Sequence, residues 1–189
     1  MNLCEPGKMR RYQILAISGS LRAASLNSTV LRVASSLPLP EGQIRIYQGL
    51  ADLPHFNPDM EGKEPASVLD LRGQLQQADG VLIACPEYAH GVPGAFKNAL
   101  DWVVASGEFV NKPVALINLF ARSIWAPALL KETLSMMTAT VIEPASITLQ
   151  LPGNKVSEDF IAADARIASA MRSSLAAFVH AIKEHKAAS

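Results

Sequence analysis

Small polar side chains and one arginine gather in the segment SGSLRAASLNS (residues 18–28), between an apolar run and a helical pattern. The residues of interest are Ser20, Arg22, Ser25 and Asn27. Backbone N–H groups at a helix N-terminus bind anions, and hydroxyl, amide and guanidinium groups add hydrogen bonds and charge suited to a phosphate monoester. Gly19 is the only glycine of the segment, so a terminal phosphate fits it better than a pyrophosphate. The alternative is a polar loop in which Ser25 simply caps the helix.

A second segment, CPEYAHGVPG (residues 85–94), combines stiffness with an open backbone. Its prolines restrict the chain, and its glycines leave room for a flat ring to lie against the main chain. Tyr88 can stack on such a ring or form a hydrogen bond with it. His90 is either a group that faces a substrate or a surface and packing residue, and the pattern leaves both interpretations open.

Apolar runs that alternate with helical patterns must position these two segments. The runs predict strands at 12–18, 43–47, 80–84, 113–119 and 145–151. The spacing predicts helices at 25–37, from 65, from 93, at 125–137 and from 157 onward. This alternation indicates an α/β three-layer sandwich with a parallel sheet, and five strands match the flavodoxin-like order 2-1-3-4-5. Ligands of such sheets bind at the carboxyl ends of the strands, so we expect loops 19–27, 86–93 and 120–125 to form one site.

Taken together, the two segments resemble the NADPH-dependent FMN reductase family, which includes quinone, azo-dye and chromate reductases. The matching patterns are G-S-L-R-x-x-S-x-N after the first strand and P-E-Y-x-x-G-x-P-G-x-x-K-N-A-L-D-W after the third. The resemblance covers roughly residues 11–185. It implies a flavodoxin-like fold, non-covalently bound FMN, and NADPH or NADH as co-substrate. It also implies a homodimer or homotetramer and a small-molecule electron acceptor, namely a quinone, azo compound, flavin or metal oxyanion.

The resemblance also implies roles for individual residues. The phosphate of FMN would be held by Ser20, Arg22, Ser25 and Asn27. The flavin ring would lie against Pro86, Glu87, Tyr88, Ala89 and Gly91. The second segment or a subunit contact would be supported by Asn98, Asp101 and Trp102, with ordinary helix packing as the alternative. No catalytic side chain is implied, because the flavin carries the redox chemistry. A flavodoxin-like FMN carrier or sensor with little turnover is the alternative function.

The chain departs from the family pattern at two places. The family usually carries asparagine after the tyrosine of P-E-Y, where this chain has Ala89, so one hydrogen-bonding side chain is lost. After the fourth strand the family usually has glycine-rich sequence, whereas residues 118–125 here are NLFARSIW. In this third segment Phe120 and Trp125 could stack on the flavin or crowd it, and Arg122 could hold a substrate anion, including a phosphate of NADPH. We therefore expect His90, Phe120 and Arg122 to bind substrate; packing for the rings and a solvated charge for Arg122 are the alternatives.

The composition argues against several other classes of protein. The chain has 17 basic and 17 acidic residues and a formal net charge of zero, so we expect binding neither to nucleic acid nor to a membrane surface. Cys4 and Cys85 form no metal-ligand pattern, so no metal is expected, and Cys85 is interpreted as a buried apolar residue. Residues 1–11 lack the apolar core of a signal peptide. We expect them to be a flexible arm before a single FMN-binding domain (12–186) in a cytoplasmic protein.

Overall fold

Strongly apolar runs become the central strands of one parallel sheet. The computed structural model describes residues 11–153 and 155–188. The expected N-terminal arm therefore lies outside the described residues, apart from Arg11. The strands are β1 (Tyr12–Ser18), β2 (Gly42–Ile46), β3 (Gly80–Ala84), β4 (Pro113–Asn118), β5 (Thr140–Val141) and β6 (Ile147–Thr148). Their order is β2-β1-β3-β4-β5, with β6 also paired to β4, which confirms the predicted doubly wound topology.

The fifth position of the sheet differs from the single strand expected at 145–151. Two short strands, β5 and β6, pair with β4 on either side of a 3₁₀ turn, η3 (Glu143–Ala145). Pro144 lies in this turn, and a proline has no N–H to donate to a strand ladder. Ser146 bridges the gap, because its hydroxyl accepts from Leu116 N (3.1 Å) and donates to Ile142 O (3.0 Å).

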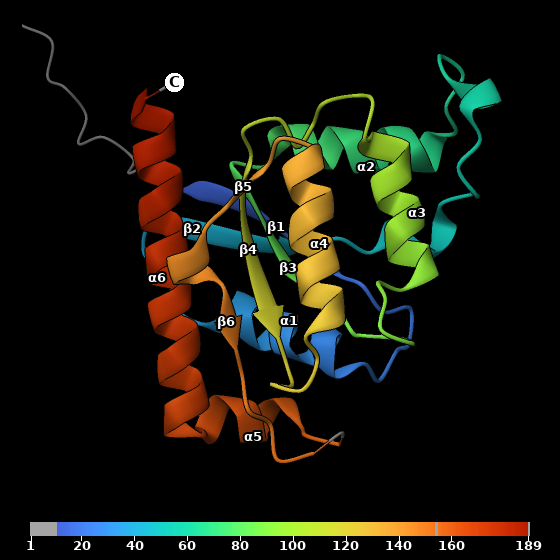
Figure 1. Cartoon of the computed structure of the whole chain (residues 1–189). Helices are drawn as coiled ribbons and strands as arrows, with labels where there is room; N and C mark the ends of the chain where they lie inside the picture. Colours follow the sequence, from blue (N-terminus) through green and yellow to red (C-terminus); the bar gives the residue numbers. More distant parts are fainter. Residues whose placement is uncertain (1–10, 154, 189) are drawn as a thin grey trace, which may run out of the picture.

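Helices cover both faces of the sheet (Figure 1). One face packs against α1 (Leu26–Ser36), α5 (Glu158–Ala163) and α6 (Ala165–Ala188). The other packs against α2 (Ala66–Gln77), α3 (Gly94–Val103) and α4 (Trp125–Met136). Successive β1 residues alternate between these two cores, as the pleat of a strand requires: Ile14 and Ala16 face one, and Leu15 and Ile17 face the other.

The C-terminal helix begins where the sequence predicts and then breaks. Ser157 caps α5, since its hydroxyl accepts from Phe160 N (3.2 Å). The break falls at Asp164, whose carboxylate accepts from the N–H groups of Arg166 (2.9 Å) and Ile167 (3.1 Å) and so starts α6. No helix among the described residues is long and apolar enough to cross a membrane.

Two further 3₁₀ turns, η1 (Gly49–Asp52) and η2 (Pro58–Met60), lie in the long connection between β2 and α2. The first of these turns follows the carboxyl end of β2, the same end at which the chain leaves β1, β3 and β4 by the three loops that carry the candidate residues. The carboxyl ends of parallel strands share one edge, so the fold brings these loops together, at the lower edge of the sheet in Figure 1.

Candidate functional site

The loops after β1 and β3 touch at Gly19. Its N–H donates to Ala84 O (2.9 Å), which continues the sheet pairing by one residue. A Cβ at this position would lie 2.6 Å from Cys85 Sγ and 3.2 Å from Cys85 Cα, so only glycine fits. Burial raises the pKa of the Cys85 thiol to about 12. The thiol therefore stays neutral between the loops, but Cys85 is half-buried and lines a pocket, so it is less buried than the sequence predicts.

The start of α1 is free to receive an anion. Ser25 occupies the N-cap position, but its side chain forms no capping hydrogen bond, and the first turn contains no acidic residue. The first backbone N–H groups of a helix have no partner within the helix. The Oδ1 atom of Asn27 is buried without a hydrogen-bond partner among the described residues. The free N–H groups fit a phosphate, whereas the unpaired Oδ1 of Asn27 is an acceptor and fits a donor group of the same ligand.

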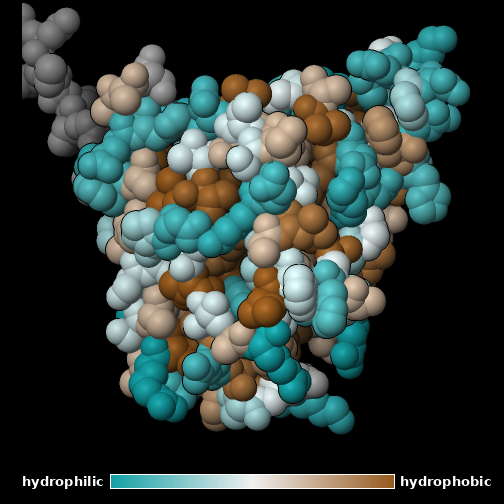
Figure 2. Space-filling model, viewed as in Figure 1, coloured by the Kyte–Doolittle hydropathy of each residue, from teal (hydrophilic) through white to brown (hydrophobic). Residues whose placement is uncertain are grey.

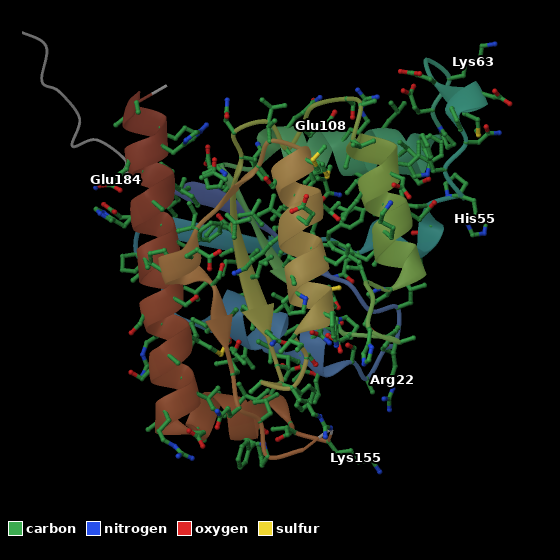
Figure 3. The ribbon with its side chains drawn as sticks, in the orientation of Figure 1. Arg22, His55, Lys63, Glu108, Lys155 and Glu184 are labelled. Carbon is green, nitrogen blue, oxygen red and sulfur yellow. The ribbon has the colours of Figure 1, made fainter. Side chains whose placement is uncertain are left out.

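Most of the residues expected to bind FMN and substrate line two neighbouring hollows. The larger, of about 480 Å³, is lined by Asn27, Cys85, Pro86, Glu87, Tyr88, His90, Asn118, Phe120, Arg122 and Ser123. Ser20 and Arg22 instead line a hollow of about 260 Å³ with Ser18, Ser28, Arg32 and Tyr47. Figure 3 shows Arg22 at the edge where the strands end, directed outward. Ser25, Ala89 and Gly91 line neither hollow, so the structure gathers the expected residues around the first loop rather than on one side of it.

The second loop closes on itself in a tight turn. Tyr88 N donates to Gly91 O (3.0 Å), and Gly91 N donates to Tyr88 O (2.9 Å). The two residues between them have positive φ angles, 49° at Ala89 and 62° at His90. Asparagine and glycine are the residues that favour this conformation. Ala89, which departs from the family pattern, therefore has a left-handed backbone conformation that asparagine would adopt more easily.

Glu87 reaches across to the helix that follows the third loop. Its Oε2 accepts from the backbone N–H groups of Trp125 (2.8 Å) and Ala126 (2.9 Å). The N-cap residue of α4 is Ile124, whose side chain has no acceptor, and the first turn holds no acidic residue. A carboxylate from another loop thus caps α4. Sequence reasoning placed Glu87 against the flavin ring and missed this capping role.

The third loop is a closed turn held by Asn118. The Nδ2 of Asn118 donates to Phe120 O and Ser123 O (3.0 Å each), and Ser123 N donates to Phe120 O (2.9 Å). Arg122 lies over Phe120, with its guanidinium carbon 5.9 Å from the ring centre. The rings of His90 and Trp125 lie 5.5 Å apart at 30°. Sequence reasoning gave no role to Asn118, although a polar residue at the carboxyl end of an apolar strand was a usable signal.

The helix residues expected to support the second loop hold a different segment. Asn98 Nδ2 and Trp102 Nε1 both donate to Pro54 O (2.9 and 2.7 Å), and Asn98 Oδ1 accepts from Phe56 N (2.7 Å). Asp101 pairs with Lys97 along α3. These contacts fix the connection between β2 and α2, not residues 86–91.

A charged cluster at the opposite edge of the sheet is paired internally (Glu108 in Figure 3). Arg72 donates to Glu108 (2.8 Å) and Glu64 (2.9 Å), and the Glu108 bond raises the pKa of the guanidinium further. Within 11–153 and 155–188, no group of acidic, histidine or cysteine side chains is arranged to hold a metal ion.

One family model matches most of the chain. Residues 12–151 match the model of the NADPH-dependent FMN reductase family. A quinone reductase of Escherichia coli is 36% identical over 110 residues, which is 56% of this chain and 58% of that protein. An NADPH:quinone oxidoreductase of Arabidopsis thaliana is 38% identical over 112 residues (56% and 57%). These matches span less than two thirds of the curated relatives.

A solved structure extends the similarity over nearly the whole chain. FerB, a flavoenzyme NAD(P)H:(acceptor) oxidoreductase from Paracoccus denitrificans, superposes with a TM-score of 0.74 and 28% identity. The superposition covers 92% of this chain and 98% of FerB. With the flavodoxin-like sheet order and the motifs after β1 and β3 in place, the family match identifies this chain as a member of the NADPH-dependent FMN reductase family.

Proposed function

We propose that the protein is an FMN-dependent oxidoreductase that uses NADPH or NADH to reduce small acceptors: quinones, azo compounds, flavins or metal oxyanions. The observation that carries the proposal is the 480 Å³ pocket at the carboxyl ends of β1, β3 and β4, bordered by both family motifs. Relatives named quinone reductase and the similarity to FerB support it. When bound, FMN supplies the redox chemistry, taking a hydride from the nicotinamide and passing electrons to the acceptor.

The residues of this chain would bind and orient FMN and the second substrate. The free N–H groups at the start of α1 would hold the phosphate together with Ser20, Arg22, Ser25 and Asn27. The stiff backbone around Pro86, Tyr88, Ala89 and Gly91 would support the flavin ring, while Glu87 fixes that loop to α4. The group that would face the second substrate is His90, Phe120 and Arg122.

Anaerobic stopped-flow spectroscopy of the purified yellow protein tests the activity. NADPH or NADH should bleach the flavin absorbance rapidly, and a quinone should restore it. A yellow protein that only dithionite bleaches would instead be the carrier or sensor. A colourless protein that FMN cannot reconstitute would contradict both functions.

We propose in addition that the protein assembles as a homodimer or homotetramer with the pocket near a subunit junction. Leu129 and Met136 of α4 expose 47% and 75% of their surface. Figure 2 shows apolar surface along α4 and beside it over the edge of the sheet. A second copy covering this face would remove that surface from water. Light scattering should give a dimer or larger form, and a monomer that still oxidises NADPH at micromolar concentration would contradict this.

A cytoplasmic location and a single FMN-binding domain over 12–186 complete the proposal. They rest on the charge balance, on the two widely spaced cysteines and on the continuity of the sheet with α6. Fractionation of cells that express the protein tests the location, and limited proteolysis tests the domain boundary.

A further inference from the structure

We propose that Arg122, with Phe120, His90 and Trp125, forms a subsite for an electron acceptor that carries an anionic group on a flat aromatic ring. The inference rests on the proposed function, because it names the class of acceptor that the same pocket takes. It follows from the charge of the pocket rim, from its flat surfaces and from the rigidity of the third loop.

The pocket rim has one uncompensated charge. Among the residues that line the pocket, Glu87 is the one carboxylate and Arg122 the one guanidinium. The Glu87 carboxylate is already engaged by the N-terminus of α4 through two N–H groups. No carboxylate of residues 11–153 or 155–188 pairs with Arg122, although other arginines of the chain, such as Arg32 and Arg72, are paired. An anionic ligand is therefore the partner that Arg122 lacks.

The surfaces around this charge are flat and apolar. Arg122 lies over the ring of Phe120, and His90 lies beside the ring of Trp125. Tyr88 and Trp125 expose 55% and 54% of their surface. Exposed rings beside a pocket offer stacking surface to an aromatic ligand. An aromatic acceptor can lie among these rings while its charged substituent reaches Arg122.

The third loop holds Arg122 in place before any ligand arrives. Asn118 fixes the turn through Phe120 O and Ser123 O, and Glu87 fixes the first residues of α4 directly after it. The loop also lacks the glycines that would give its backbone freedom. Although the Arg122 side chain is exposed, its backbone is fixed, so less backbone entropy is lost when it binds a ligand.

The 2′-phosphate of NADPH is a second source of the same anionic chemistry. The apolar ring of Phe120 beneath the guanidinium favours an anion carried on an aromatic ring over one carried on a hydroxylated ribose. We therefore assign the subsite to the acceptor. The experiment also measures the KM for NADPH, to test whether Arg122 binds the coenzyme instead.

Isothermal titration calorimetry of the FMN-loaded protein compares naphthalene-2-sulfonate with its neutral analogue, naphthalene-2-sulfonamide. The wild type should bind the sulfonate about 10-fold more tightly or better, as a charge-assisted hydrogen bond provides. Arg122→Gln should bring the two affinities close to equality, and Arg122→Lys should keep part of the preference. Arg172→Gln, which removes an exposed arginine from α6, should keep all of it.

Equal affinities in the wild type, or a preference that survives Arg122→Gln, would overturn the subsite. So would an Arg122→Gln variant whose KM rises for NADPH alone while its sulfonate preference is intact, because Arg122 would then serve the coenzyme. Titration needs no turnover. If NAD(P)H fails to bleach the bound flavin, the proposed function is overturned. The comparison of sulfonate with sulfonamide still decides whether the subsite exists.

Discussion

The turn at Ala89 and His90 shows that a residue can be favoured both for its backbone conformation and for its side-chain hydrogen bonds. Both residues have positive φ angles in the turn from Tyr88 to Gly91. A side chain with a Cβ pays roughly 1–2 kcal/mol for this conformation, and asparagine tolerates it better than alanine does. The asparagine that is usual in the family at position 89 therefore has a conformational role besides its hydrogen bonds.

Ala89→Asn should accordingly raise the free energy of unfolding by about 0.5–1 kcal/mol, because the side chain suits the left-handed backbone. Urea unfolding measures the effect. Ala105→Asn, at an exposed alanine with an ordinary φ angle, should give no such gain. Destabilisation by Ala89→Asn would show that alanine is preferred here for another reason.

Arg22→Ala should weaken FMN more than riboflavin, since only FMN carries the phosphate. Arg22 is exposed on the first loop, so we expect a loss near the lower end of about 1.5–3 kcal/mol. Fluorescence titration with both flavins measures it, and Arg166→Ala on the exposed start of α6 is the matched control. Equal weakening of the two flavins would refute the assignment of Arg22 to the phosphate.

The half-buried Cys85 thiol should react slowly because it stays protonated. Its pKa of about 12 in the folded protein lies above the ordinary value of 9.0, so the unfolded chain ionises first as the pH rises. Cys85 therefore contributes full stability below about pH 9 and progressively less between pH 9 and 12. In a Cys4→Ser background, iodoacetamide at pH 8 should modify the unfolded protein and spare the native one. Rapid labelling of the native protein would contradict this burial.

The link between Glu87 and α4 turns two loops and a helix into one unit. Because Ile124 cannot cap the helix, the carboxylate of a distant loop takes that place. The loop proposed to support the flavin and the loop that carries Arg122 are thus fixed relative to each other.

Glu87→Ala should lower the free energy of unfolding by about 1–2 kcal/mol, the value of a lost N-cap that also faces the helix dipole. Glu87→Gln keeps one acceptor oxygen and should cost less. Glu132→Gln, at an exposed site on the same helix, should change stability little. Urea unfolding of the four proteins gives the comparison, and equal stabilities would show that the cap contributes nothing.

Helices and strands could be predicted where a single local signal, such as an apolar run or a capping residue, determines the secondary structure. The apolar runs located β1, β3 and β4, and Ser157 located the start of α5. The interruptions were harder. Pro144 breaks the last strand within a run of strand-forming residues, and Asp164 both ends α5 and starts α6, although the apolar spacing continues across it. In both places a local hydrogen-bonding feature, a missing N–H at Pro144 and a capping carboxylate at Asp164, outweighs a periodicity that extends over many residues.

For the molecule as a whole, strand order and the meeting of the three loops at one edge followed from general rules for parallel sheets. The division of the expected residues between two hollows could not be predicted in this way, because it depends on the side of the first loop to which each side chain points. Ser20 and Arg22 take one side and Asn27 the other. The capping role of Glu87 was equally hidden, since residues 87 and 125 meet only after the sheet has formed.

The interrupted edge beside β4 also affects the tendency of the protein to aggregate at high concentration. A long, regular outer strand offers unpaired N–H and C=O groups on which foreign chains can polymerise. Here that border consists of two-residue pieces separated by the turn at Pro144, and Ser146 uses its own hydroxyl where a strand would pair. A continuous row of acceptors and donors is never presented, so this side of the sheet is a poor template for fibrils.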